Sequence, residues 1–311
     1  MLFFQGQRGE TGFMQSFLKG FILLPILWAA CSCSVMHRQP TPSDHAGPAV
    51  YPGYVPRGTV EERIYPSSVP GASHRRMIVY LPEGYQDNTR RYPVVYLLHG
   101  ARGYETSWIK KGLMLQLTDS LFAGGYAVPS IVVMPNMNQY DNDADYGDSR
   151  YKNALESFFE VNGVAETGFR HDVVDYVDAH FRTIPDKAHR AVAGLSIGGL
   201  QSAYLSANNP DTFGYVGLFS PVFRANSLPN PFRDFYRKFR KKLQVQFDEP
   251  PTRYLLMAGK KDIVRLPASM YHKFLGRKGY GHDFTLSPGG HSWSNWRNYY
   301  VEMMTKLFIE E

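Results

Sequence analysis

Cysteine is scarce in this sequence. Cys31 and Cys33 are the two cysteines in 311 residues, and none follows residue 33. A disulfide within the later part of the chain is therefore excluded, and so is a cysteine-ligated metal site there. Any role of the two cysteines belongs to the N-terminal segment.

Long hydrophobic runs are also missing. The longest, residues 21–30, is too short to span a bilayer comfortably and contains Pro25. Lys19 precedes this run and Cys31 follows it directly, which is typical of a bacterial lipoprotein signal: a basic residue, an apolar segment, then Ala-Ala-Cys. We expect transport across the inner membrane, lipidation of Cys31, and a periplasmic or outer-membrane-anchored protein.

The lipidation site has alternatives. Trp28 replaces the aliphatic residue that is usual three positions before a lipidated cysteine, so Cys33 is the second candidate. A signal that is cleaved without lipidation is a further interpretation. Met14 gives a cleaner start for the signal than Met1, and residues 1–13 are then a mis-assigned extension.

The sequence lacks a strong excess of charge. It has 34 Lys and Arg against 28 Asp and Glu, a formal net charge of +6, and this mild excess does not indicate a nucleic-acid-binding protein. Basic residues concentrate only at 233–242. Apolar residues recur there at intervals of three and four, which predicts an amphipathic helix over the sheet edge. Its basic face is either simply solvated or contacts anionic lipid or an acidic glycan.

The composition divides the chain into three parts. Residues 1–33 form the signal, and residues 34–57, with five prolines, form a flexible or extended tether. Residues 58–311 have the composition of one globular domain, and no internal repeat is visible.

Strand and helix patterns alternate through this domain. The predicted strands are Thr59–Tyr65, Arg76–Leu81, Val94–Leu98, Ile131–Met134, a strand ending near Gly194, Tyr215–Phe219, Arg253–Met257 and Phe284–Leu286. Apolar side chains at helical spacing lie between them, among them Val173, Val177 and Phe181, and a final helix presents Trp296, Tyr300, Met303 and Leu307. The alternation predicts a mainly parallel α/β sheet of about eight strands with helices on both faces.

The organising motif is a Gly-x-Ser-x-Gly turn between a strand and a helix. A short apolar strand leads into Gly194-Leu195-Ser196-Ile197-Gly198, and a helical pattern follows. Such a turn forces its central residue into strained backbone angles, so the residues on either side of the turn must be small. Gly194 and Gly198 meet this requirement. Ser196 then lies over a helix N-terminus, whose partial positive charge favours an oxyanion. We predict that Ser196 is a nucleophile.

A serine nucleophile needs a base, and the base needs an acid that fixes its tautomer. Asp262 lies just past the strand Arg253–Met257, at the end where catalytic groups of such sheets gather. Asp248 and Glu249 precede that strand and fall at its other end. We predict that Asp262 is the acid, with a turn or helix-cap role as its alternative.

The predicted base is His291. It lies on a Pro-Gly-Gly loop after the final strand and immediately before the C-terminal helix, which is the expected place for the last member of a Ser, acid, His order. The downstream alternatives are less suitable, because His272 lies in a predicted helix and His282 opens the last strand at its N-terminal side.

Two backbone N–H groups are needed to stabilise an oxyanion. We predict that Ile197, directly after the nucleophile, supplies one. The other comes from the loop after Val94–Leu98, from Ala101 or, as the second candidate, Arg102. His99 at the start of this loop is expected to brace the loop, with the role of catalytic base as its alternative.

A long irregular stretch at residues 136–168 is rich in Asn, Asp and Tyr. Its length suggests a functional loop, and side chains such as Tyr140 and Tyr146 suit sugar hydroxyls and rings. Arg102 and Trp293 are further candidates for substrate contacts. The alternatives are a polar surface loop remote from Ser196 and a Trp293 that packs under the final helix.

Together these motifs resemble the putative-esterase group of α/β-hydrolases over roughly residues 59–308. The resemblance is carried by Tyr96-Leu97-Leu98-His99-Gly100, Trp108, the Ser196 turn, Gly259 with Asp262, and Gly289-Gly290-His291-Ser292-Trp293 with Trp296-Arg297. It implies an α/β-hydrolase fold, a triad of Ser196, Asp262 and His291, and oxyanion donors at Ala101 and Ile197. The group includes feruloyl, acetylxylan and enterochelin-type esterases and S-formylglutathione hydrolases.

The leading hypothesis is a secreted, lipid-tethered serine esterase of acetyl or feruloyl groups on carbohydrate, which needs no cofactor or metal. One alternative is a siderophore esterase. Another is a catalytically silent binding lipoprotein on a hydrolase scaffold. Under the leading hypothesis, the expected partners are the ester substrate and, through the lipid anchor, a membrane.

Overall fold

The computed structural model describes residues 54–69, 72–138, 164–223 and 230–309. The predicted signal, both cysteines and nearly all of the predicted tether lie outside these residues. So does most of the polar stretch, including Tyr140 and Tyr146. None of the described helices is both long and apolar enough to cross a bilayer.

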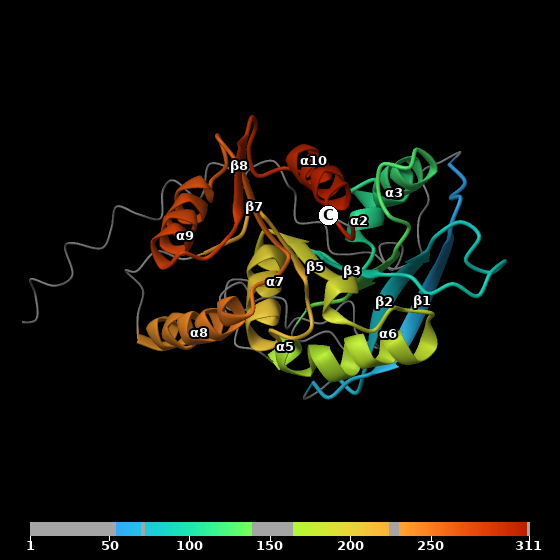
Figure 1. Cartoon of the computed structure of the whole chain (residues 1–311), viewed down its shortest axis with the longest axis horizontal. Helices are drawn as coiled ribbons and strands as arrows, with labels where there is room; N and C mark the ends of the chain where they lie inside the picture. Colours follow the sequence, from blue (N-terminus) through green and yellow to red (C-terminus); the bar gives the residue numbers. More distant parts are fainter. Residues whose placement is uncertain (1–53, 70–71, 139–163, 224–229, 310–311) are drawn as a thin grey trace, which may run out of the picture. The chain divides into compact units, whose positions relative to one another are not determined.

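Eight strands form one sheet in the described part of the chain, in the order β1-β2-β4-β3-β5-β6-β7-β8. The strands from β3 to β8 run parallel, whereas β2 pairs antiparallel with β1 and β4 (Figure 1). Their bounds are Thr59–Pro66 (β1), His74–Leu81 (β2), Val94–Leu98 (β3), Ile131–Pro135 (β4), Arg190–Leu195 (β5), Tyr215–Phe219 (β6), Arg253–Gly259 (β7) and Asp283–Ser287 (β8).

The central strands form because their side chains are apolar on both faces. Every residue of β3, β4, β5 and β6 is buried, as expected for parallel strands covered by helices on both sides. The two edge strands differ: β1 is largely exposed, and no residue of β8 is fully buried. The predicted sheet is confirmed, with strand ends within two residues of those expected.

Helices cover both faces of the sheet (Figure 1). One face packs against α5, α6, α7, α8 and α9, and the other packs against α2, α3 and α10. The bounds are Ser107–Lys110 (α2), Met114–Ala123 (α3), Val164–Gly168 (α5), the π-helix Phe169–Val174 (η3), Asp175–His180 (α6), the 3-10 helix Lys187–His189 (η4), Ile197–Asn208 (α7), Asn230–Asp248 (α8), Arg265–Lys278 (α9) and Trp293–Met304 (α10).

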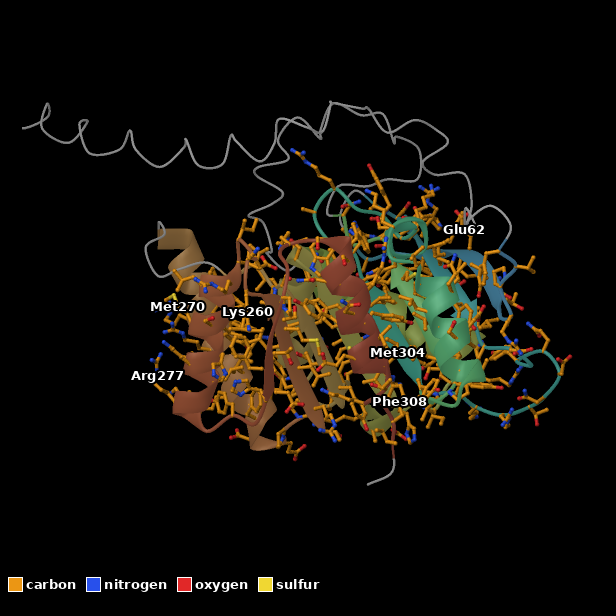
Figure 2. All side chains as sticks on the ribbon, turned by 90° about the horizontal axis from the view of Figure 1, so that it is seen from above. Glu62, Lys260, Met270, Arg277, Met304 and Phe308 are labelled. Carbon is orange, nitrogen blue, oxygen red and sulfur yellow. The ribbon has the colours of Figure 1, made fainter. Side chains whose placement is uncertain are left out.

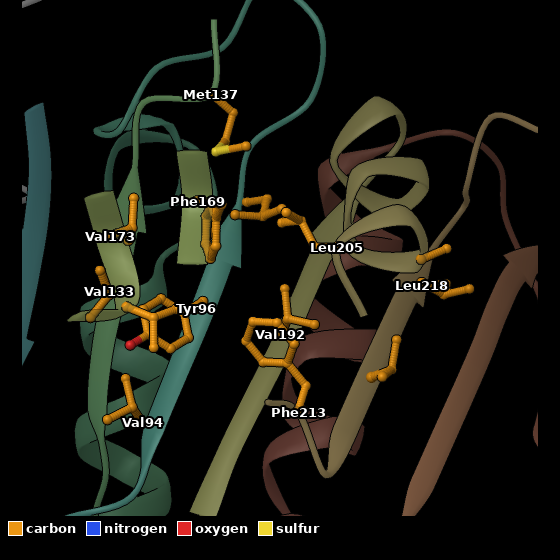
Figure 3. Close-up of a cluster of buried hydrophobic side chains, with 14 of the residues drawn as sticks. Val94, Tyr96, Val133, Met137, Phe169, Val173, Val192, Leu205, Phe213 and Leu218 are labelled. Carbon is orange, nitrogen blue, oxygen red and sulfur yellow. The ribbon is translucent and has the colours of Figure 1, made fainter. Parts of the chain in front are cut away.

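The core on the α7 face is built around the middle strands, as Figure 3 shows. Tyr96 of β3 lies between Phe169 and Phe213, with both ring pairs close to edge-to-face at centroid distances of 5.7 and 6.0 Å. Val192 of β5 and Leu205 of α7 belong to the same cluster. This packing fixes α7, and with it the turn at Ser196, against the sheet.

Two helix ends differ from the predicted pattern. The helix that was expected to include Phe181 ends at His180, and Phe181 is extended, with φ −131° and ψ 156°. The last helix ends at Met304, before Leu307. Both side chains are nevertheless buried, so the apolar spacing continues past the hydrogen-bonded helix, and spacing alone overestimates the helix length.

Candidate active site

The carboxyl ends of the parallel strands meet at one edge of the sheet. Ser196 directly follows β5, Ser220 directly follows β6, and Asp262 comes three residues after β7. His291 lies in the short loop between β8 and α10. Residues that are far apart in the sequence are therefore brought together because their strands share this edge.

The turn at Ser196 has the strained backbone that its sequence predicted. Ser196 has φ 57° and ψ −116°, and α7 begins at the next residue. A side chain at Gly194 would come within 2.5 Å of the Gly198 carbonyl oxygen, and one at Gly198 would come within 2.3 Å of the His99 carbonyl oxygen. The two glycines are therefore required by close packing as well as by the turn.

Ser196, His291 and Asp262 form one hydrogen-bonded chain. Nε2 of His291 lies 3.0 Å from Oγ of Ser196, and Nδ1 lies 3.0 Å from Oδ1 of Asp262. A carboxylate only accepts hydrogen bonds, so Nδ1 carries the proton and Nε2 is free to accept the serine proton. The side chain of His291 is 20% exposed and that of Asp262 is 0% exposed, which leaves the imidazole open to a substrate and the carboxylate shielded from water.

The other candidates for acid and base lie elsewhere. Asp248 ends α8 and Glu249 follows it, so both precede β7 and stand at the opposite end of that strand. His272 and His282 bind each other, with 2.8 Å between Nδ1 of His272 and Nε2 of His282. The structure thus brings together the three residues that were predicted and none of the four alternatives.

The surroundings of Asp262 favour its ionised form. Burial alone would raise the pKa of this carboxyl, but His291, the Ser220 hydroxyl and the Val264 N–H together lower the pKa below its usual value. The Val264 N–H donates to Oδ1 at 2.9 Å. Oδ2 makes no hydrogen bond of normal geometry with a described residue, although the Ser220 hydroxyl is placed to favour the charged form.

Ser220 and the indole of Trp296 were not predicted to support the acid. The Trp296 Nε1–H donates to Oγ of Ser220 at 3.1 Å, so the hydroxyl hydrogen of Ser220 remains free to point at Asp262. The Trp296 ring also packs edge-on against the His291 imidazole, at 4.9 Å between centroids. Ser220 directly follows a parallel strand at the shared edge, and this position is the sequence signal that could have revealed its place beside Asp262.

The loop after β3 lies against the Ser196 turn. A side chain at Gly100 would come within 2.5 Å of Leu195 Cδ1 and 3.3 Å of Ser196 Cβ, so this backbone touches the nucleophile. The N–H groups of Ala101 and Ile197 have no acceptor among the described residues. Both predicted oxyanion donors therefore belong to segments that meet at Ser196, and both are available to a ligand.

His99 holds this loop through backbone groups. Its Nδ1 donates to the Gly100 carbonyl at 2.8 Å, and its Nε2 accepts from the Met137 N–H at 2.9 Å. Burial lowers the pKa of His99 to about 4. Both ring nitrogens are thus occupied and the ring is neutral, so the bracing role is the one that the geometry supports.

A second brace was not predicted. The buried guanidinium of Arg75, from β2, donates to the carbonyl oxygens of Asn136 at 2.6 Å and Asn138 at 2.7 Å. The Asn138 amide in turn donates to the Gly103 carbonyl at 3.0 Å. The segment after β4 and the loop after β3 are therefore tied together, beginning from a side chain on a distant strand.

Two predicted substrate contacts can be placed. Trp293 is half-buried and packs edge-on against Trp108 and Trp296, each at 5.3 Å between ring centroids. Arg102 is exposed, and its positive φ of 58° turns the chain directly after Ala101. Tyr140 and Tyr146 lie outside the described residues.

Comparison with known proteins agrees with this architecture. The sequence matches the family described as Putative esterase over residues 71–307. The chain belongs to this family. Among curated proteins it is 38% identical over 146 residues to an endo-1,4-beta-xylanase/feruloyl esterase of Xylanibacter ruminicola, a match that covers 46% of this chain and 19% of the relative.

A second relative is an endo-1,4-beta-xylanase Y of Acetivibrio thermocellus, 26% identical over 200 residues, covering 61% of this chain and 16% of that protein. The chain thus spans only a small part of the length of these two relatives. Among solved structures, a ferulic acid esterase of Anaeromyces mucronatus in complex with ferulic acid has a TM-score of 0.64 and 24% identity, covering 84% of this chain and 94% of that one.

An S-formylglutathione hydrolase of Staphylococcus aureus gives a TM-score of 0.58 at 22% identity, covering 80% of this chain and 98% of that one. At such identities the solved structures establish the fold, which is that of the α/β-hydrolases. The family assignment rests on the sequence match, and it places the chain in a family of carboxylic ester hydrolases.

Proposed function

We propose that the protein is a serine esterase in which Ser196, His291 and Asp262 form the catalytic triad. The observation that carries this proposal is the hydrogen-bonded chain from Ser196 Oγ through both ring nitrogens of His291 to Asp262. A serine hydroxyl becomes a strong nucleophile only when a base in hydrogen-bond contact removes its proton.

The geometry suggests the order of events. Nε2 of His291 takes the proton from Ser196 as Oγ attacks the ester carbonyl, and Asp262 stabilises the imidazolium that forms. The N–H groups of Ala101 and Ile197 donate to the oxyanion, helped by the N-terminus of α7. His291 then protonates the departing alcohol, and water releases the acyl group from Ser196 by the same steps.

For the substrate, we propose acetyl or feruloyl groups on carbohydrate. The support is the name of the relative from Xylanibacter ruminicola, which joins a xylanase with a feruloyl esterase, and the ferulic acid that was bound to the fungal neighbour. Trp293 beside His291, packed on Trp108, gives an apolar surface that suits a short or aromatic acyl group.

A comparison of ester substrates tests this proposal. We expect kcat/KM to be higher for methyl ferulate and acetylated xylo-oligosaccharides than for palmitoyl esters, and to rise when the leaving alcohol is a sugar. A kcat/KM that rises steadily from acetyl to palmitoyl esters, with no gain from a sugar, would contradict the carbohydrate assignment. Hydrolysis of none of these esters would contradict the esterase itself.

Secretion and lipidation are part of the same proposal. They rest on the residues from Lys19 to Cys31 alone. Cells grown with labelled palmitate should yield a labelled protein that partitions into detergent, and Cys31→Ser should abolish both properties. If Cys33→Ser abolishes them and Cys31→Ser does not, the modified residue is Cys33.

A further inference from the structure

Helices α8 and α9 present an exposed basic surface at one end of the sheet, which we call the cationic face. Figure 2 places Lys260, Met270 and Arg277 at this end, away from Met304 and Phe308. Its members are exposed lysines and arginines of α8, of the turn after β7 and of α9: Lys238, Lys241, Lys242, Lys260, Lys261, Arg265, Lys273, Arg277 and Lys278.

The cationic face is not neutralised by neighbouring acids. None of its nine cations forms an ion pair with a residue that the structure describes. The sequence explains why: residues 230–309 hold 15 Lys and Arg against 6 Asp and Glu, whereas residues 54–229 hold 16 against 18. The excess positive charge of the domain is thus concentrated in the part that contains α8 and α9.

Exposed aliphatic side chains lie among these cations. Ile263, Leu266 and Met270 are 64%, 67% and 41% exposed, and Val245 on α8 is 57% exposed. Leu266 and Met270 share one face of α9 with Lys273 and Arg277, because these positions recur at helical spacing. Of the eight large apolar side chains that are exposed in the described chain, three therefore belong to α9 and the turn before it, and a fourth, Val245, belongs to α8.

Aromatic contacts on the buried side fix the positions of α8 and α9. Phe223 stacks on Tyr271 of α9 at 4.0 Å and on Phe239 of α8 at 6.4 Å between ring centroids. Phe247 at the end of α8 stacks on Tyr280 after α9 at 4.4 Å. Phe239 and Phe247 of α8 are packed in these contacts. The exposed side chains of α8 that the structure describes are therefore chiefly charged.

We propose that the cationic face docks on an anionic lipid bilayer. Lysines and arginines without acidic partners attract anionic headgroups, and exposed aliphatic side chains are stabilised when they enter the headgroup boundary. An acidic polysaccharide would satisfy the charges, but sugar rings are bound by exposed aromatic faces. The exposed apolar residues of this surface are aliphatic.

Part of the cationic face lies on the turn that carries the proposed acid. Ile263 directly follows Asp262, and Lys260 and Lys261 directly precede it. The proposal does not depend on a lipid anchor, and it does not depend on which ester is cleaved, because its residues are outside the triad and the oxyanion loop.

Vesicle binding of the full chain tests the proposal, with Cys31→Ser and Cys33→Ser combined so that no lipid can be attached. The vesicles contain equal parts of phosphatidylglycerol and phosphatidylcholine, or phosphatidylcholine alone. We expect binding to the anionic vesicles only. Lys241→Glu with Lys242→Glu should weaken it at least about tenfold, while Arg90→Glu with Lys111→Glu, the same change of net charge outside the cationic face, should leave it nearly intact.

The apolar part is tested in the same assay at raised salt. Leu266→Gln with Met270→Gln should weaken binding at least about fivefold, whereas the matched exposed pair Val55→Gln with Ile64→Gln should not. All four double variants should hydrolyse a soluble acetyl ester as the parent does. This readout separates loss of docking from loss of fold or of catalysis.

Three results would overturn the proposal. The parent could fail to prefer anionic vesicles, or the two charge-reversal pairs could weaken binding equally. The third is a protein that ignores both vesicles but binds soluble polygalacturonate and loses that binding with Lys241→Glu and Lys242→Glu. That result would assign the cationic face to an acidic glycan instead.

Discussion

Two serines follow neighbouring parallel strands with the same unusual backbone. Ser196 after β5 has φ 57°, and Ser220 after β6 has φ 49°. The two turns are hydrogen-bonded to each other, because the Ser196 N–H donates to the Phe219 carbonyl oxygen at 2.8 Å and the Val222 N–H donates to the Ser196 carbonyl oxygen at 3.3 Å. Only one of them has the surroundings of a nucleophile, and the difference shows what a nucleophile needs beyond a strained turn.

The partners of the two hydroxyls are different. Ser196 directly precedes α7, and its Oγ lies 3.0 Å from Nε2 of His291, an acceptor. Ser220 is completely buried, and its Oγ receives the Trp296 Nε1–H, a donor. A base beside the first hydroxyl can make it a nucleophile, whereas the second hydroxyl has a donor beside it and no base to take its proton. The strained turn therefore positions a serine, and its neighbours decide its role.

Replacing the first serine should have the largest effect. Ser196→Ala should reduce kcat for ester hydrolysis by at least about three orders of magnitude, because the other triad members act only through that oxygen. Hydrolysis of p-nitrophenyl acetate measures this, with circular dichroism as the check on folding. Near-normal turnover by the variant would mean that Ser196 is not the nucleophile.

Replacing Asp262, the proposed acid, should have the next largest effect. Asp262→Asn should lower kcat by about three to four orders of magnitude while the fold persists, because an amide favours the wrong imidazole tautomer. Asp248→Asn and Glu249→Gln are the controls and should have almost no effect. If kcat fell strongly in one of these controls and little in Asp262→Asn, the acid would lie at the other end of β7.

Replacing His99, which supports the loop after β3, should have a smaller effect on kcat. His99→Ala should lower kcat about tenfold with little change in KM, because the Ala101 N–H loses its support while the triad is intact. The pKa of His99 is about 4, so this side chain is neutral above about pH 5. The pH profile of kcat/KM should thus keep its shape. Loss of the acidic limb in His99→Ala would make His99 the titrating base.

Replacing the second serine should have the smallest effect and a distinctive pH dependence. Ser220→Ala removes a group that lowers the pKa of Asp262, so that pKa should rise and kcat should fall by less than about tenfold. A carboxyl with a lowered pKa stabilises the fold above its unfolded pKa, near 3.8, and that stability is lost as the pH falls through the folded value.

Thermal unfolding measures this effect. The parent should be more stable than Ser220→Ala by about 1 kcal/mol at pH 7, and the gap should shrink below about pH 4 as Asp262 becomes protonated. Ser220→Thr, which keeps the hydroxyl, is a control for the lost group. A gap that stays constant with pH would mean that Ser220 contributes only packing.

The sequence allowed the sheet and the grouping of Ser196, Asp262 and His291 to be predicted, because both rest on local patterns. Buried strands read as apolar runs, and the elbow, Asp262 and His291 each follow a strand end. Strand ends were off by up to two residues and helix lengths were overestimated, because apolar spacing continues into turns such as the one that contains Leu307.

Support that crosses the sheet could not be predicted. Arg75 reaches Asn136 and Asn138 across 61 and 63 positions, and Trp296 reaches Ser220 across 76. Such contacts depend on which strands are neighbours and how side chains turn, and no spacing in the sequence encodes either. The same is true of the exposed aliphatic side chains of α9, which become a surface only when the helix is placed beside α8.

Covalent labelling distinguishes the two serines most directly. The native protein is treated with a fluorophosphonate, and its peptides are analysed by mass spectrometry. We predict a single adduct on Ser196, none on Ser220, and loss of labelling in both Ser196→Ala and His291→Ala. An adduct on Ser220, or labelling that persists in Ser196→Ala, would contradict the account.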